Sequence, residues 1–302
     1  MAITLEAMEA GSAQSAVEGF LDGLDGSAQT RKTYQDALKA FFRWFDQTKE
    51  SLSPDAVKGY RDWLRPRCTA NTVATYLVAL RRFLDHCVQE GMLAHNPALG
   101  VRAVRKPRGH LRHDLSRAQL RRVFERIDRS TPIGQRDFAI VNLMARNGLR
   151  VIEVARANVE DLERVQGRTI LRVLGKGRDS RDEFVVLSPL TQGILTDYLK
   201  ARGQPRRQEP LFVSMGLRNV GGRLCTRTIH RRVSGYLKAA GVKSEKVSPH
   251  SLRHSFVTLA IEGGATLVEA QAAARHRSVQ TTMVYFHEHG RLNDPIEDRI
   301  EI

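Results

Sequence analysis

The strongest fold signal in this chain is the pair Ser-Pro, which stands at Ser53-Pro54, Ser188-Pro189 and Ser248-Pro249. A serine side chain can accept a hydrogen bond from the first turn of a helix, and proline fits that turn because its missing N–H would have no partner there. Each pair therefore predicts the start of a helix, so helices are expected in both halves of the chain.

Apolar residues at three- and four-residue steps predict that residues 12–92 form a compact domain of about four helices. Tyr34, Leu38 and Phe41 begin one such buried stripe, and Thr69 can cap a long helix that carries another. Aromatic residues at this spacing usually form a core, so we assign no chemistry to them. The boundaries of the two better-defined helices are about residues 30–49 and 54–64.

A basic segment without any acidic residue, residues 100–112, follows the helical half. It predicts three parts: a helical domain over residues 1–98, a linker over 99–112 and a second domain over 113–302. A charge run is usually only solvated, but one that joins two domains is well placed to lie along a DNA backbone. Together with basic residues elsewhere, the expected DNA contacts are Arg81, Arg82, Arg102, Arg105, Lys106, Arg108 and Arg178.

The second half adds two β-rich runs, residues 169–174 and 183–187, around Gly175-Lys176-Gly177. They predict an antiparallel hairpin with a lysine at its tip, and residues 211–213 are expected to add an edge strand. The fold class is therefore mainly α with a small antiparallel β-sheet. Helices are expected at about residues 116–129, 134–147, 189–203, 226–240, 249–262, 266–275 and 279–285, with a short one beginning at Arg150.

The charge balance favours a polyanionic partner, because 48 Lys and Arg stand against 33 Asp and Glu, a formal net charge of +15. Each phosphate neutralised by such a surface releases counterions, so nucleic acid is the first expectation and an acidic membrane surface the second. No apolar run approaches the roughly 20 residues that cross a bilayer, and residues 1–9 do not resemble a signal peptide. The three cysteines are unpatterned, which suits a reducing compartment, so we expect a cytoplasmic protein without a membrane partner.

A histidine and an arginine lie over the start of the helix predicted at Ser248. His250 falls in its first turn, beside unpaired N–H groups and the positive end of the helix dipole, and Arg253 follows on nearly the same face. Such a pair favours an oxyanion, especially phosphate. The plainer interpretation is a capped surface helix that is basic.

Four groups of residues, taken in order, resemble the tyrosine site-specific recombinases, or integrases. The run from Asn147 through Arg150 to Glu153 is similar to the family's first-arginine box, and Gly175-Lys176-Gly177 to its hairpin lysine. His250-Ser251-Leu252-Arg253-His254 is similar to its His-x-x-Arg box, and His276 with Tyr285 to its final box. Each motif alone is weak, but their common order is highly specific. The resemblance covers nearly the whole chain. It implies a two-domain clamp on duplex DNA, in which residues 1–98 are similar to the family's core-binding domain and residues 113–302 to its catalytic domain.

The resemblance implies that Tyr285 attacks a DNA phosphodiester and forms a 3′-phosphotyrosine bond. Attack adds negative charge to the two non-bridging oxygens, and fixed guanidinium forks offset that charge best, so Arg150 and Arg253 are the natural pair. Because the covalent bond stores the energy of the broken one, no cofactor is expected: resealing requires neither ATP nor a metal. The plainer interpretation of Arg150 is a surface charge at a helix end, and that of Tyr285 is half-buried packing.

Proton transfer defines the remaining roles. The hydroxyl of a tyrosine has an ordinary pKa of about 10, so His250 is the candidate base, while Lys176 is expected to protonate the leaving 5′-oxygen. His276 would donate to a non-bridging oxygen, with Glu153 as an orienting group and His254 as a supporting donor or a merely buried residue. A Gly-Lys-Gly tip is usually a solvated turn. Clustered histidines could also bind zinc, but no carboxylate stands at a recognisable spacing, so no metal is expected.

The sequence departs from the family at Ala274-Arg275-His276, where Leu-Gly-His is usual. Arginine costs up to about 1 kcal/mol at that glycine position if its φ is positive, which would alter the join between two helices and the placement of His276. Residues 286–302 form an acidic tail with three isoleucines, and the resemblance implies that it docks onto a neighbouring protomer in a tetramer on DNA. The alternative is a frayed end.

The function implied is site-specific recombination between paired DNA sites through a Holliday junction. It would serve integration, excision or resolution of a mobile element or replicon in a prokaryote or phage, with or without a second recombinase or a directionality factor. Two rivals stay open. One is a nicking-closing enzyme like a type IB topoisomerase, and the other is a catalytically idle DNA-binding accessory protein.

Overall fold

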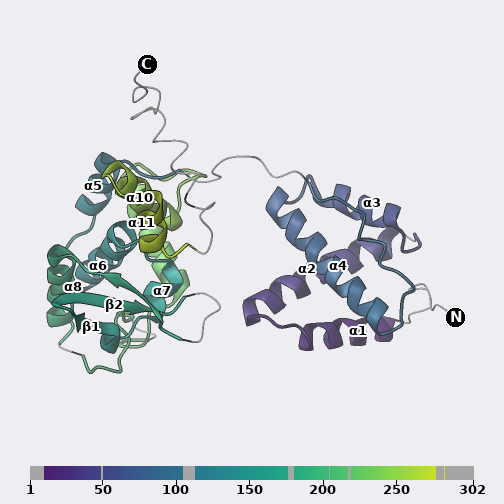
Figure 1. Cartoon of the computed structure of the whole chain (residues 1–302), viewed down its shortest axis with the longest axis horizontal. Coiled ribbons are helices and arrows are strands. Elements are labelled where there is room, and N and C mark those ends of the chain that lie inside the picture. Colours follow the sequence, from purple (N-terminus) through teal and green to yellow (C-terminus); the bar gives the residue numbers. More distant parts are fainter. Residues whose placement is uncertain are drawn as a thin grey trace, which may run out of the picture. The chain divides into compact units, whose positions relative to one another are not determined.

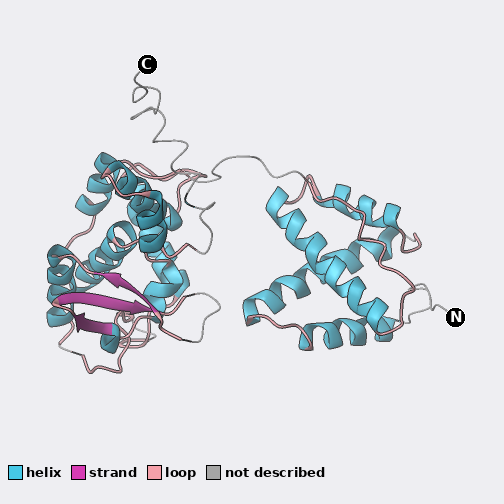
Figure 2. Ribbon diagram, in the orientation of Figure 1, coloured by secondary structure: helices cyan, strands magenta, loops and turns pink. Residues whose placement is uncertain are grey.

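The computed structural model describes residues 10–48, 50–104, 113–175, 180–203, 205–216, 219–276 and 282. The chain divides into two compact units, Met1–Arg108 and Gly109–Ile302. The division falls inside the basic segment expected to be the linker. Of that segment, residues 105–112 lie outside the described part. Figures 1 and 2 show helices alone in the first unit and helices around a small sheet in the second.

The first unit is built from the helices that the apolar spacing predicts. Tyr34, Leu38 and Phe41 are buried in its core, as predicted, and the ring of Phe41 meets that of Tyr60 edge-on at 5.1 Å between centroids. The Thr69 side chain accepts from the N–H of Thr72 and begins the long helix. The helices are α1 (Ala10–Asp22), α2 (Ala28–Thr48), α3 (Pro54–Leu64) and α4 (Ala70–Gln89).

The centre of the second unit is one largely buried helix, α6 (Pro132–Arg146). It packs against α8 (Pro189–Ala201), α9 (Thr226–Ala239) and α10 (Pro249–Glu262). All three Ser-Pro pairs begin helices, as predicted: α3, α8 and α10. Its other helices are α5 (Arg117–Glu125), α7 (Val151–Arg156), the 3₁₀ helix η2 (Val159–Asp161) and α11 (Leu267–Ala274).

The sheet has three antiparallel strands in the order β1 (Leu162–Val165), β2 (Arg168–Val173) and β3 (Glu183–Val186). The hairpin of β2 and β3 was predicted, but β1 was missed because its four residues carry little pattern of their own. The prediction of an edge strand at residues 211–213 was wrong. In the described residues, Val213 makes only an isolated bridge to Arg223.

The end of one helix also differs from the sequence prediction. Helix α5 ends at Glu125 rather than near residue 129, because the chain turns where the carboxylate of Asp128 accepts from the N–H of Ser130 at 2.9 Å. The helix expected at about residues 279–285 lies, except for Thr282, outside the described residues.

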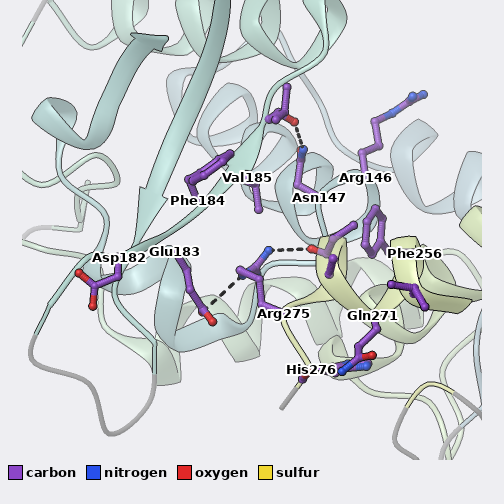
Figure 3. A pocket seen from close by; sticks show the side chains of 14 residues that line it. Arg146, Asn147, Asp182, Glu183, Phe184, Val185, Phe256, Gln271, Arg275 and His276 are labelled. Atoms are coloured by element: carbon purple, nitrogen blue, oxygen red, sulfur yellow. Dashed lines mark hydrogen bonds and ion pairs between the residues drawn. The ribbon is translucent and has the colours of Figure 1, made fainter. Parts of the chain in front are cut away.

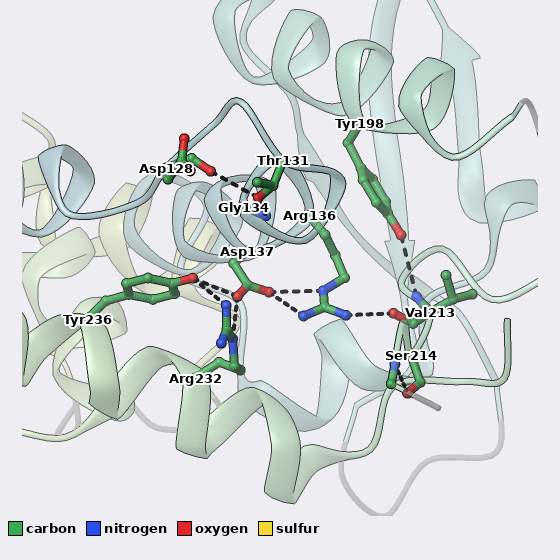
Figure 4. A network of polar contacts seen from close by, with 11 residues as sticks. Asp128, Thr131, Gly134, Arg136, Asp137, Tyr198, Val213, Ser214, Arg232 and Tyr236 are labelled. Atoms are coloured by element: carbon green, nitrogen blue, oxygen red, sulfur yellow. Dashed lines mark hydrogen bonds and ion pairs between the residues drawn. The ribbon is translucent and has the colours of Figure 1, made fainter. Parts of the chain in front are cut away.

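A buried polar network fastens α9 to α6 (Figure 4). Asp137, only 2% exposed, accepts from Arg136 at 2.7 Å, from Arg232 at 2.6 Å and from the hydroxyl of Tyr236 at 2.8 Å. Arg136 also donates to the carbonyl of Val213 at 2.9 Å. Burial, and then the charge of Asp137, raise the pKa of Tyr236 to about 12. The buried charge of Asp137 thus has two guanidinium partners and a hydroxyl donor, as a buried carboxylate requires.

Candidate functional site

The site begins at the turn that ends α6. Gly148 has φ 62°, and a Cβ added to it would lie 2.5 Å from the ring of Phe256 on α10. Only glycine combines that backbone conformation with that close approach. The turn brings the next residues to the start of α7, where Arg150 occupies the N-cap position with extended backbone angles.

Glu153 fixes Arg150 from within the protein. The carboxylate is fully buried; its Oε2 accepts from the backbone N–H of Arg150 at 2.8 Å, and its Oε1 from Nη1 of the same residue at 2.6 Å. The side chain of Arg150 remains 31% exposed. The guanidinium is therefore held in place by Glu153 and by the carbonyl of Arg275, yet stays partly exposed, which suits a group that binds an anion.

Arg253, on the first turns of α10, is 2% exposed. Its guanidinium donates to the carbonyls of Gly148 and Ala274, and so ties α10 to the turn before α7 and to the end of α11. Burial lowers the pKa of Arg253 to about 9, and the neighbouring charge of Arg150 adds to the effect. The two like charges repel each other, and an anion bound between them would offset that repulsion.

His276 follows α11 and faces the same cluster. Its Nδ1 lies 2.9 Å from the hydroxyl of Thr282. Burial, followed by the charges of Arg253 and Arg150, lowers the pKa of His276 to about 4. The imidazole is consequently neutral at physiological pH, and its Nδ1 is engaged by Thr282.

The two histidines of α10 lie together at its start. The rings of His250 and His254 meet edge-on with 4.6 Å between centroids. His250 is exposed, and its charge contributes to the lowered pKa of His276, so it borders the same cluster. The described residues therefore bring together Arg150, Glu153, His250, His254, Arg253 and His276 from three separate parts of the chain.

Arg275 adds a third guanidinium, whose role the sequence analysis missed. It has φ 56° and ψ 48°, so the family's glycine position does require a positive φ here. The N–H groups of Arg275 and His276 bond to the carbonyls of Ala272 and Gln271 and close α11 with a left-handed cap. The only signal in the sequence was that arginine stands at a position where glycine is usual in the family.

The side chain of Arg275 turns inward (Figure 3). Its Nη2 lies 2.8 Å from Oε2 of Glu153, its Nη1 donates to the carbonyl of Ala273 at 3.1 Å, and its Nε lies 4.0 Å from a carboxylate oxygen of Glu183. Arg275 and His276 also line a cavity of about 890 Å³ beside β3, which Phe184 and Phe256 complete on the apolar side. Burial raises the pKa of Glu153, but the charge of Arg275, the N–H of Arg150 and the nearby arginine charges together hold that pKa below its ordinary value.

Two predicted site residues, Lys176 and Tyr285, lie outside the described residues. The hairpin that carries Lys176 is anchored at its base, where Arg156 of α7 donates to the carbonyl of Gly175 at 3.0 Å. Of the expected DNA contacts, four others also lie outside the described residues: Arg105, Lys106, Arg108 and Arg178.

The first unit holds the remaining expected DNA contacts. Arg81 donates to the carbonyls of Ala98 and Val101, so its guanidinium fastens the end of that unit to α4. Arg82 is exposed and lies over the ring of Tyr34 at 5.9 Å. Arg102 is exposed as well.

Neither a metal cluster nor a membrane span occurs in the part of the chain that the structure describes. No three His, Cys, Asp or Glu side chains there lie close enough to hold an ion. Nor is any helix there both long and apolar enough to cross a bilayer.

Comparison with known proteins covers both units. A model of the phage integrase family matches residues 113–291, and a model of the phage integrase SAM-like domain matches residues 15–102. Tyrosine recombinase XerC of Chromohalobacter salexigens is 32% identical, over 90% of this chain and 90% of its own length. Tyrosine recombinase XerD of Pseudomonas aeruginosa is 31% identical, over 92% of this chain and 94% of its own length.

Solved structures share the fold. The XerH recombinase bound to a palindromic difH substrate, in a post-cleavage complex, aligns with a TM-score of 0.76 at 20% identity, over 97% of this chain and 85% of that one. Lambda integrase, as a tetramer bound to a Holliday junction, aligns with a TM-score of 0.72 at 16% identity, over 93% of this chain and 78% of that one.

Proposed function

The chain belongs to the phage integrase family, and from this premise we propose that it is a site-specific DNA recombinase that cleaves and rejoins strands through a covalent bond between DNA and Tyr285. One observation carries the proposal for the site. The guanidinium groups of Arg150 and Arg253 and the imidazole of His276 come from three separate elements and lie in one electropositive cluster.

The arginines would bind the scissile phosphate. Arg150 presents an open guanidinium, and Arg253 is buried behind it with a pKa lowered by burial and by like charge. A phosphate between them relieves that repulsion, and the relief grows as attack adds charge to the non-bridging oxygens. The two arginines would therefore bind the transition state more strongly than the ground state.

The histidines and the hairpin lysine would move protons. His250 is exposed at the N-terminus of α10, where it can take the proton of the attacking phenol, and His254 packs against its ring and positions it. His276, neutral at physiological pH, would donate a hydrogen bond to a non-bridging oxygen. Lys176 would protonate the leaving 5′-oxygen. Glu153 orients Arg150 and does not react, because its carboxylate is buried and paired.

The substrate would be duplex DNA with paired recombination sites. The domains over residues 1–98 and 113–302, joined by the basic linker over 99–112, would clamp the duplex, and the net charge of +15 supports such a partner. We further propose that four protomers assemble on DNA through the tail of residues 286–302, and that the enzyme works in the cytoplasm. A second recombinase or a directionality factor would define the direction of exchange.

The test is covalent capture. A nicked suicide substrate is mixed with the protein and separated by denaturing electrophoresis. The proposal predicts a DNA–protein adduct that Tyr285→Phe abolishes and Tyr76→Phe, which removes a hydroxyl in the first unit, leaves unchanged. An adduct that survives in Tyr285→Phe would overturn the assignment of the nucleophile, and no adduct with the natural chain would favour the idle accessory protein.

A two-site plasmid separates recombination from simple nicking and closing. Recombinant product that requires both sites supports the proposal. Supercoil relaxation by monomers, without any recombinant product, would instead identify an activity like that of a type IB topoisomerase.

A further inference from the structure

We infer that Arg275 is a positioning residue for strand cleavage: by pairing with Glu153, it keeps the charge of Arg150 available to the scissile phosphate. The inference rests on the proposed function. It concerns the position at which the sequence departs from the glycine usual in the family that it resembles, and it explains how a buried arginine is accommodated there.

The two carboxylate oxygens of Glu153 bind the side chains of different arginines. Oε1 accepts from Nη1 of Arg150 at 2.6 Å, whereas Oε2 accepts from Nη2 of Arg275 at 2.8 Å and from the backbone N–H of Arg150. Without Arg275, Arg150 would be the only charged residue in the described part of the chain that donates a hydrogen bond to either oxygen, while the charge of Arg253 would still act from nearby. The carboxylate would then neutralise the group that is needed by the phosphate.

The charges around the site support this division of roles. The groups that face Arg275 are Glu153, Arg150 and Arg253, with His276 next in the chain and Glu183 at 4.0 Å from its Nε. The three guanidinium groups outnumber the two carboxylates, Glu153 and Glu183, so this group of residues has an excess of positive charge. Removing Arg275 would lessen that excess where the phosphate binds.

Arg275 also holds Arg150 through its own backbone. Its carbonyl accepts from Nη2 of Arg150 at 3.3 Å. Residue 275 therefore contacts Arg150 directly, and it also acts on Arg150 through Glu153. Its left-handed backbone conformation leads the chain on to His276. The contact to Glu153 is the one that requires the arginine side chain, because any residue at this position would keep the backbone carbonyl.

Three variants distinguish the effect of the charge of Arg275 from the effect of its backbone conformation. Arg275→Gly relieves the positive φ but removes the charge, whereas Arg275→Lys keeps the charge and the strained backbone, and its amine can replace the single contact to Glu153. Arg275→Gly with Glu153→Gln removes both charges of the pair. Single-turnover cleavage of a nicked substrate and the affinity for the same DNA are measured separately, and circular dichroism verifies folding.

We expect Arg275→Gly to slow cleavage by about tenfold to hundredfold, with a change in DNA affinity of about threefold or less. Arg275→Lys should stay within about fivefold of the natural chain, and the double variant should recover about tenfold over Arg275→Gly. Cleavage by Arg275→Gly at the natural rate would overturn the inference. So would Arg275→Lys as slow as Arg275→Gly, or a double variant no faster than it.

The pKa of His276 in the DNA-free protein tests the inference about Arg275 independently of the proposed function. In the free protein, Arg275→Gly should raise the pKa of His276 above the natural chain's value, because a neighbouring positive charge is gone; NMR titration of the imidazole records it. An unchanged pKa of His276 would contradict the inferred charge effect even if the natural chain formed no DNA adduct. A raised pKa without any adduct would instead place the failure in the proposed function.

Discussion

The guanidinium of Arg253 donates to the carbonyl of Gly148, two residues before Arg150 in the chain. One arginine of the site therefore positions the turn that presents the other. The contact explains why Arg253 is buried, although helix spacing alone would place it on the face above the helix N-terminus. This arrangement, and the elements that support it, can be tested by substitution and by pH.

Arg253→Lys should slow strand cleavage by about a hundredfold to a thousandfold, with a smaller effect on DNA affinity. Lysine cannot donate to both carbonyls as a fork, and the burial that lowers the pKa of Arg253 would act on a lysine as well and favour its neutral form. Single-turnover cleavage is the measurement. Arg202→Lys is the matched control, because Arg202 also donates to two carbonyls, those of Pro210 and Leu211. Equal losses in both variants would mean that packing, not phosphate binding, sets the rate.

Gly148→Ala should destabilise the second unit by about 2 kcal/mol or more. Its φ of 62° strains alanine, and the new methyl group would meet the ring of Phe256 at 2.5 Å. Urea denaturation measures the free energy of unfolding. Gly241→Ala isolates the strain, since Gly241 has φ 68° and a methyl group there would meet nothing within 4 Å in the described residues; it should lose only about 1 kcal/mol. The explanation fails if the two variants are equally stable.

Asp137→Asn should lower the free energy of unfolding by about 3–5 kcal/mol, because it leaves the buried guanidinium of Arg136 without its carboxylate and weakens the bond from Arg232. The same denaturation experiment applies. Asp128→Asn, which alters an exposed carboxylate that accepts from Ser130, should change stability little. A stability of Asp137→Asn equal to that of the control would show that the network does not hold α9 to α6.

The stability of the protein should fall as pH drops from about 6.5 towards about 4, and His276 should contribute to the loss. The folded-state pKa of His276 lies below its ordinary value, so in this window the unfolded state binds more protons, and stability rises with pH. Urea denaturation at several pH values is the measurement. His276→Gln should flatten the dependence over this window; an unaltered slope would exclude His276 as a source.

Local chemistry explains which parts of the fold could be predicted. The Ser-Pro pairs begin α3, α8 and α10, since a cap depends on residues that are neighbours in the chain. Strand β1 could not be predicted, because its four residues become a strand only by pairing with β2. The end of α5 at Glu125 depends in the same way on the later turn at Asp128.

The same difference between local signals and contacts of distant residues applies to the site. The motifs identified Arg150, Glu153, His250, Arg253 and His276, which the structure brings together. The pair of Glu153 and Arg275 joins residues 122 positions apart, and no local pattern predicts such a contact. The sequence could show that Arg275 departs from the family, but not that its side chain turns inward to a buried carboxylate. The catalytic roles, and those of Lys176 and Tyr285 above all, stay predictions.

The most direct test of the account is mass spectrometry of the trapped DNA–protein adduct after proteolysis. It identifies both the residue that carries the nucleotide and the end of the strand to which it is attached. The account predicts a nucleotide joined through its 3′-phosphate to the oxygen of Tyr285. A nucleotide on another side chain, or one joined through a 5′-phosphate, would contradict it.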